Sequence, residues 1–338
     1  MEDQIGNFFV GFRRPDPTAA LYKVEVNTPQ YTFVANAAAI AIKVLQTQKS
    51  KNALVRLALA ISSHTPTRAP IQNVTQASHV VDLFISKISQ KFPGIIVDAT
   101  IADVRMLGYH VGVAWQGSLD QFNTRSQVVH VNAARLQDLI SAANTTPASN
   151  HGRTQFRIFM FQLANTLVHE VGGHLFMTFI SQNMLSPTGQ LQRPFTPESV
   201  TYSDYGSQGV GESGRLLESA IFGGSMEYFR DNTAGDRQAG VPYILNETNN
   251  SVRRISQTTI DNFVINQDFV FPYPLQGPAH PWNTMPSLAN VQGPVELPDP
   301  SLRPQIPLEL VPHLAGSRVR FSQLRLALSN PSILAVPA

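Results

Sequence analysis

The chain has 338 residues, of which 43% are hydrophobic and 14% charged, with a formal net charge of +2 and no cysteine. This composition excludes a disordered protein and a small protein held together by disulfides, and the length allows one large domain or two. Basic residues form no run longer than a pair such as Arg13-Arg14, so we expect no nucleic-acid partner.

The N-terminus carries Glu2 and Asp3 and lacks the basic start and long apolar core of a secretory signal. The absence of cysteine suits a reducing compartment. We therefore expect the protein in the cytoplasm, although a core of this size is also compatible with export.

The first part of the chain, residues 1–150, has an α+β pattern. An alanine-rich run at 34–48 predicts a helix. Short apolar runs bounded by Pro or Gly predict strands at 94–98, 109–115 and 127–131. Together these runs indicate an N-terminal sheet with helices packed on it.

The second part, residues 151–230, is predicted to be helical. It contains a long apolar stretch at 158–180, a polar loop at 186–208 and a second helix that starts near Ser213. The apolar stretch is nearly long enough to cross a bilayer, but five polar residues lie near its middle. These favour a helix buried in protein, so we expect no membrane partner.

The third part, residues 231–338, is predicted to be rich in loops. Eleven of the 24 prolines fall between residues 271 and 312, and the closing run at 318–328 predicts a helix. Because no flexible linker separates the three parts, we expect residues 1–338 to form a single compact body with a C-terminal wrap.

One string inside the long apolar stretch carries the chemistry: His169-Glu170-Val171-Gly172-Gly173-His174. Two histidines four residues apart lie about 40° apart on an α-helix and can share one Zn²⁺, whereas the five-residue spacing separates them by about 140°. A shared metal therefore requires a local π-turn, which returns position i+5 to the same face. Two consecutive glycines cost about 1 kcal/mol each in a helix, and a π-turn would account for them.

Chance alone predicts roughly 0.01 such strings in a chain with nine histidines. The alternative interpretation is a pair of buried core histidines that hydrogen-bond to their neighbours. Because Glu170 accompanies the pair, we favour a metal site.

A second motif follows at 212–224. Glu212-Ser213-Gly214, three further residues and Glu218 resemble the third-ligand helix of the thermolysin-like gluzincins, which ends in a short apolar stretch and F-G. The H-E-x-x-G-H spacing is similar to that of the dipeptidyl peptidase III family, whose second motif is absent. Phe222 stands where the thermolysin-like family has an aspartate. The chain thus resembles the zincin metallopeptidase clan over two motifs, which implies a zincin-like α+β fold.

The resemblance implies one Zn²⁺ held by His169, His174 and Glu218, with Glu170 as the general base. The apolar neighbours of Glu218 support its role, because a carboxylate in such company is rarely buried unless it is paired or metal-bound. Glu212 is the alternative third ligand. Zinc lowers the pKa of a bound water to about 7, and Glu170 would accept its proton.

An oxyanion donor is harder to identify. Zincins often use a tyrosine or a histidine, and Tyr205 is the candidate here, with Tyr202, His280 and Arg215 behind it. A loop tyrosine is more often ordinary packing. His130 is interpreted as a half-buried strand histidine.

The leading hypothesis is a zinc-dependent hydrolase, a metallopeptidase that cleaves peptide or peptide-like amide bonds. One alternative is a zinc enzyme that acts on a small non-peptide metabolite. Another is a non-catalytic protein with a structural zinc site, against which the presence of Glu170 argues, because that residue supplies no ligand. The sequence does not indicate the oligomeric state of the protein.

Overall fold

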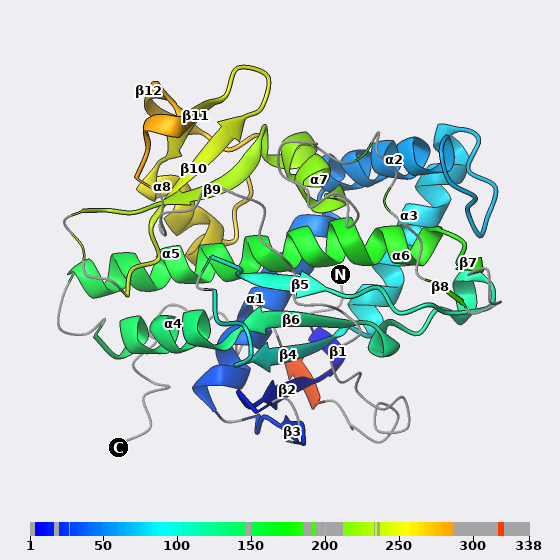
Figure 1. Ribbon diagram of the computed structural model, residues 1–338, viewed down its shortest axis with the longest axis horizontal. Coiled ribbons are helices and arrows are strands. Elements are labelled where there is room, and N and C mark those ends of the chain that lie inside the picture. The colour runs from blue at the N-terminus through cyan, green and yellow to red at the C-terminus, as the bar shows by residue number, and fades with distance from the viewer. Residues whose placement is uncertain are drawn as a thin grey trace.

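The computed structural model describes residues 4–16, 20–26, 28–103, 105–145, 150–185, 191–192, 196, 200, 212–232, 234, 237–286 and 317–320. Helices and strands mix along the chain, which confirms the predicted α+β class (Figure 1). The helices are α1 (Pro29–Gln46), α2 (Gln48–Ser62), α3 (Val74–Gln90), α4 (Ala133–Thr145), α5 (Asn150–Leu167), the π-helix η3 (Val168–Leu175), α6 (Phe176–Ile180), α7 (Ser213–Phe222), α8 (Gln257–Asp261) and the π-helix η5 (Asn262–Asn266).

Two sheets dominate the described part of the chain. The five-stranded sheet has the order β3-β2-β4-β6-β5 and contains β3 (Tyr22–Lys23), β2 (Val10–Arg13), β4 (Gly94–Asp98), β6 (Val128–Asn132) and β5 (Gly108–His110). The four-stranded sheet has the order β12-β11-β10-β9 and contains β12 (Leu275–Pro281), β11 (Ser251–Ile255), β10 (Val241–Asn246) and β9 (Ser225–Phe229). Two small pairs join β1 (Gln4–Phe8) to β13 (Ser317–Arg320) and β7 (Met184–Leu185) to β8 (Leu191–Gln192).

The five-stranded sheet is parallel at its centre and antiparallel at both edges. Strands β2, β4 and β6 run in the same direction, and β3 and β5 pair antiparallel to the outer members. Every residue of β4 is buried, as expected for a central parallel strand with the sequence Gly-Ile-Ile-Val-Asp. In Figure 1 the long helical rod formed by α5, η3 and α6 lies beside β5, and β5 contacts η3.

The main core is a cluster of apolar side chains that draws on all three parts of the chain, from Phe8 to Tyr273, and two small clusters lie beside it. Helix α1 lies inside it and is buried along most of its length, which its alanine-rich sequence permits. Thr28 caps the helix by accepting a hydrogen bond from the Tyr31 N–H, and Pro29 occupies its first turn.

A buried polar network surrounds Asp98 at the end of β4. Its carboxylate contacts the His130 Nδ1 at 2.7 Å, accepts a hydrogen bond from the Tyr109 hydroxyl at 2.9 Å and pairs with Arg13 at 3.4 Å. The His130 and Tyr109 rings stack with their centroids 4.4 Å apart. Burial alone would raise the pKa of Asp98, but hydrogen bonds from His130 and Thr100 hold it well below its usual range. His130 is thus buried and hydrogen-bonded within the sheet.

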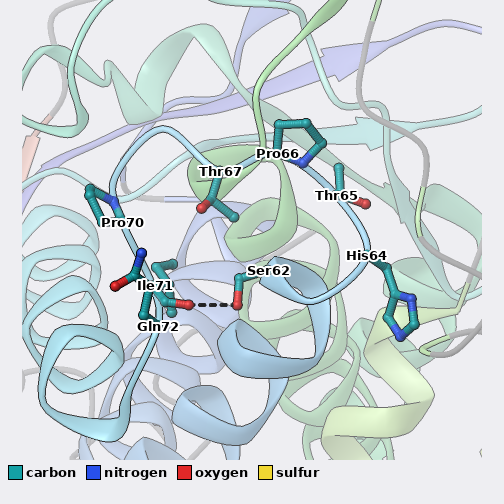
Figure 2. Close-up of a pocket in the computed structure, with 8 residues that line it drawn as sticks. All are labelled: Ser62, His64, Thr65, Pro66, Thr67, Pro70, Ile71 and Gln72. Carbon is teal, nitrogen blue, oxygen red and sulfur yellow. Dashed lines mark hydrogen bonds between the residues drawn. The ribbon is translucent and has the colours of Figure 1, made fainter.

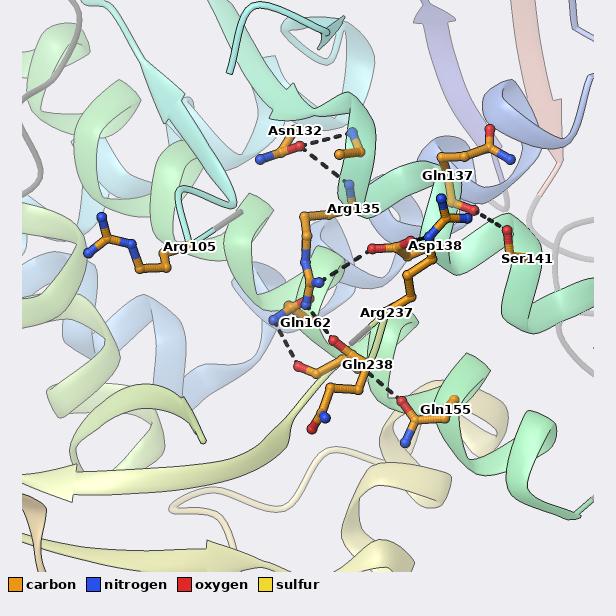
Figure 3. A network of polar contacts seen from close by, with 12 residues as sticks. Arg105, Asn132, Arg135, Gln137, Asp138, Ser141, Gln155, Gln162, Arg237 and Gln238 are labelled. Carbon is orange, nitrogen blue, oxygen red and sulfur yellow. Dashed lines mark hydrogen bonds and ion pairs between the residues drawn. The ribbon is translucent and has the colours of Figure 1, made fainter. Parts of the chain in front are cut away.

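A second polar network fixes the chain before β10 against α4 and α5 (Figure 3). Arg135 donates to the Gln238 carbonyl at 2.9 Å and pairs with Asp138 at 3.4 Å. Gln155 accepts from the Ala239 N–H at 3.0 Å. These contacts engage both Nη atoms of the largely buried Arg135 guanidinium, so we assign the network a structural role.

Some observed helices and strands agree with the ranges predicted from the sequence, and others differ. Strands β4 and β6 and the start of α7 lie where the sequence predicted them. The closing run at 318–328 was predicted to be helical, but residues 318–320 belong to strand β13, and residues 321–328 lie outside the described residues. Part of the predicted loop-rich region forms the sheet strands β10, β11 and β12.

The predicted strand at 109–115 ends early, at His110. Beyond it, the Gln127 side chain takes the place of a neighbouring strand: its amide donates to the Val113 carbonyl and accepts from the Val113 N–H, both at 2.9 Å. The chain then turns towards α6, where the Trp115 indole donates to the Thr178 carbonyl at 2.9 Å.

Among the described helices, none is long and apolar enough to cross a membrane. A surface hollow of about 400 Å³ lies on the connection between α2 and α3 (Figure 2). Its lining includes Ser62, His64 and Gln72 and contains no residue of the histidine motif.

Candidate metal centre

The two motif histidines converge because the helical rod changes its winding where they stand. The whole stretch from Val168 to Leu175 is a π-helix, which confirms the predicted π-turn. The imidazole rings of His169 and His174 have their centroids 5.1 Å apart. His169, Glu170 and His174 each offer a ligand atom, and these three atoms lie within 4.8 Å of one another.

Gly172 and Gly173 are explained by packing. Neither has a positive φ, so the backbone itself does not demand glycine. A β-carbon on Gly172 would lie 2.5 Å from Leu217 Cδ2, and one on Gly173 would lie 2.3 Å from the Cα of Gly214. The glycine pair therefore allows α7 to lie directly against η3.

Helix α7 contacts both histidines. Glu218 Oε1 lies 2.9 Å from His169 Nδ1, and Ser213 Oγ lies 3.2 Å from His174 Nδ1. The other carboxylate oxygen of Glu218 accepts a hydrogen bond from the Met226 N–H at 2.9 Å. Glu212, directly before the helix, places Oε2 3.7 Å from His169 Nε2.

Glu170 is the buried carboxyl of the cluster, with 5% of its surface exposed. Its Oε2 has no hydrogen-bond partner among the described residues. Burial raises the pKa of Glu170 to about 7, partly offset by His169 and by a hydrogen bond from the His110 backbone. A carboxyl with that pKa is suited to exchanging a proton near neutral pH.

Acidic groups around His169 favour its charged form when no metal is bound. Burial by itself lowers the pKa of His169, but Glu218, Glu170 and Glu212 outweigh burial and raise it to about 9. Two imidazoles with nearby carboxylates form a donor set that fits Zn²⁺.

An ion pair joins Arg215 of α7 to Glu227 of β9. Arg215 Nη1 lies 2.7 Å from Glu227 Oε1. Burial lowers the pKa of Arg215, but Glu227 and Glu212 outweigh it and raise the pKa above the usual value. Arg215 thus partly balances the negative charge at this end of the site.

Of the predicted site residues, the structure brings His169, Glu170 and His174 into one group, and Glu218 contacts His169 from α7. Tyr205 and Tyr202 lie outside the described residues.

His280 lies on β12, paired with Val252, and is exposed and absent from the cluster. Ser213 was not predicted. Its place at the first position of α7, next to Glu212, is the sequence signal that points to it.

No protein-family model, no curated protein and no solved structure matches the chain.

Proposed function

We propose that the protein is a zinc-dependent hydrolase that cleaves peptide or peptide-like amide bonds. The observation that carries the proposal is the convergence of two imidazoles on a buried carboxyl whose Oε2 has no partner among the described residues. A structural zinc site does not need such a carboxyl, whereas a hydrolytic site needs a base beside its metal.

In this proposal His169 and His174 hold Zn²⁺ together with a carboxylate of the α7 region, Glu218 in the sequence-based assignment. Bound Zn²⁺ would supply a water of lowered pKa and an electrophile for the substrate carbonyl. Glu170 would accept a proton from the attacking water and deliver it to the leaving nitrogen. Burial raises the pKa of Glu170 towards neutral pH, which suits a group that takes up and releases a proton.

Strand β5 supports a peptide over a small metabolite as the substrate. It is the edge strand of the five-stranded sheet, pairs with β6 and contacts η3. An extended peptide can add to such an edge through main-chain hydrogen bonds, which would lay a scissile bond beside Glu170. Zincins resemble one another in placing a sheet edge beside the substrate.

The test measures zinc content and hydrolysis of a quenched peptide library, with non-peptide amides in parallel. The wild-type protein should hold one Zn²⁺ and cleave peptides. Glu170→Gln should keep its zinc and lose about 10²–10⁴ of the rate, because the amide cannot accept a proton. The exposed Glu25→Gln serves as the control. Wild-type turnover by Glu170→Gln on a verified substrate would contradict the proposal.

A further inference from the structure

The region of α7 presents two carboxylates to His169, from different sides of its ring. Glu218 Oε1 lies 2.9 Å from Nδ1, and Glu212 Oε2 lies 3.7 Å from Nε2. We propose that Glu212 is the third zinc ligand and that Glu218 is a positioning residue that acts through His169. This inference rests on the proposed function. It exchanges the roles that the sequence suggested for Glu218 and Glu212.

The contacts of Glu218 already engage both carboxylate oxygens. Oε1 contacts His169 Nδ1 and Oε2 accepts from the Met226 N–H at 2.9 Å, and the side chain is 7% exposed. A separation of 2.9 Å is that of a hydrogen bond, with a proton between nitrogen and oxygen. Both oxygens of Glu218 are thus already held by contacts within the protein.

Glu212 Oε2 lies at nearly the distance from His169 Nε2 that two ligands of one metal show, whereas the group within 4.8 Å among the described residues consists of His169, Glu170 and His174. With zinc bonds of about 2.0–2.2 Å and tetrahedral angles, a ligating nitrogen and oxygen lie about 3.4 Å apart. The 3.7 Å between Glu212 Oε2 and His169 Nε2 is close to this value. Among the described residues, this is the one close polar contact of the Glu212 carboxylate, and the side chain is 25% exposed.

The proton on His169 Nδ1 also decides which nitrogen can ligate. A histidine that donates Nδ1–H to a carboxylate presents the lone pair of Nε2 to a metal, a pairing that recurs around zinc. Ser213 Oγ contacts the same ring nitrogen, Nδ1, on His174. Helix α7 therefore contacts Nδ1 of both imidazoles, which leaves Nε2 of His169, the side on which Glu212 lies, for the metal.

The packing of α7 explains how one short segment can both supply a metal ligand and position His169. Gly214 lies so close to the His169 ring that an added β-carbon would come within 2.3 Å of Nε2. Glu212 precedes this contact and Glu218 lies one turn beyond it. The chain therefore reaches His169 twice, once on each side of the ring.

The test compares Glu212→Gln with Glu218→Gln in the full-length protein, using Zn²⁺ affinity from chelator competition. Loss of an outer partner costs about 10–100-fold in metal affinity, and we expect that loss for Glu218→Gln. Glu212→Gln should lose more than 100-fold, because a neutral amide replaces an anionic ligand. Near-wild-type zinc affinity of Glu212→Gln would overturn the inference.

Two spectroscopic readouts separate ligation from positioning. The visible spectrum of the Co²⁺-substituted protein should change in Glu212→Gln and keep its band pattern in Glu218→Gln. Imidazole ¹⁵N spectra of the zinc protein should show His169 with Nδ1 protonated and Nε2 bound to metal, and Glu218→Gln should shift the Nδ1 resonance. A metal on Nδ1, or a cobalt spectrum altered by Glu218→Gln alone, would assign the ligand to Glu218.

Circular dichroism and thermal unfolding of the metal-free variants control for folding. Glu212 is partly exposed, so Glu212→Gln should fold even where Glu218→Gln does not, and its affinity alone decides the assignment. If the wild-type protein binds neither Zn²⁺ nor Co²⁺, the proposed function itself fails and the inference falls with it.

Discussion

A β-carbon on Gly173 would lie 2.3 Å from the Cα of Gly214, so η3 and α7 meet there backbone against backbone. Side chains of ordinary size cannot enter this contact. It sets the distance at which Ser213 and Glu218 reach the two histidines, and the geometry of the site depends on it.

Gly173→Ala should therefore destabilise the protein by about 3 kcal/mol, the upper end of the range for overpacking, because backbone atoms cannot move aside cheaply. Gly214→Ala meets the tip of the His169 ring, which can move. We expect a smaller stability loss and a clear loss of zinc affinity. Urea unfolding of the metal-free proteins and chelator competition measure the two effects. Equal losses of stability in Gly173→Ala and Gly214→Ala would contradict this prediction.

His174→Ala should abolish retention of zinc through dialysis, because it removes one of the two imidazoles on η3. His64→Ala is the matched control, since His64 is exposed and lies on the connection between α2 and α3. Elemental analysis of both variants beside the wild-type protein gives the stoichiometry. Full zinc occupancy in His174→Ala would remove the histidine motif from the site.

Ser213→Ala should lower zinc affinity by about tenfold, because Ser213 Oγ lies 3.2 Å from His174 Nδ1 and orients that ring. Ser219→Ala on the same helix should leave the affinity unchanged, since Ser219 contacts Glu247. Chelator competition measures both variants. An equal response to the two substitutions would show that Ser213 acts only through helix stability.

Asp98→Asn should cost about 3–5 kcal/mol at neutral pH, because it removes the charge on which a buried network depends. The pKa of Asp98 is lowered in the folded state, so its contribution is present above the unfolded-state pKa of about 3.9 and is lost as the pH falls through the folded-state pKa. The gap between wild type and variant should be widest above pH 4 and narrow in acid.

Asp82→Asn is the control for Asp98→Asn. Asp82 pairs with Lys51 at 2.7 Å, but its side chain is 61% exposed, so we expect a loss of at most about 1 kcal/mol. Urea unfolding over a pH series measures both variants. A similar cost for the two would indicate that the network around Asp98 adds no stability.

The sequence predicted those features that depend on local pattern. The unbroken apolar run at Gly94–Asp98 predicted β4, and the five-residue spacing of His169 and His174 predicted the π-helix η3. Helices α2 and α3 were not among the predicted elements, although α2 buries Leu54, Leu57 and Ile61 at helical spacing. The helical spacing of these apolar residues is therefore a sequence signal for α2.

Other features depend on tertiary contacts that no local pattern records. The end of β5 follows from the Gln127 amide pairing with Val113, 14 residues away in sequence. The glycine pair was interpreted as a requirement of the π-turn, but the approach of α7 requires it. Which nitrogen of His169 faces which carboxylate likewise depends on how α7 packs.

The pairing of β1 with β13 has a consequence for synthesis on the ribosome. Gln4 lies opposite Arg320, so β1 can pair only after about 300 further residues have been translated. At ordinary elongation rates this translation takes roughly 15–60 s. Strands β2, β4 and β6 are all available by residue 132 and can assemble during that time. Until β13 emerges, β1 exposes an open edge to neighbouring nascent chains, and a ribosome that stalls before Ser317 would release a molecule prone to strand exchange.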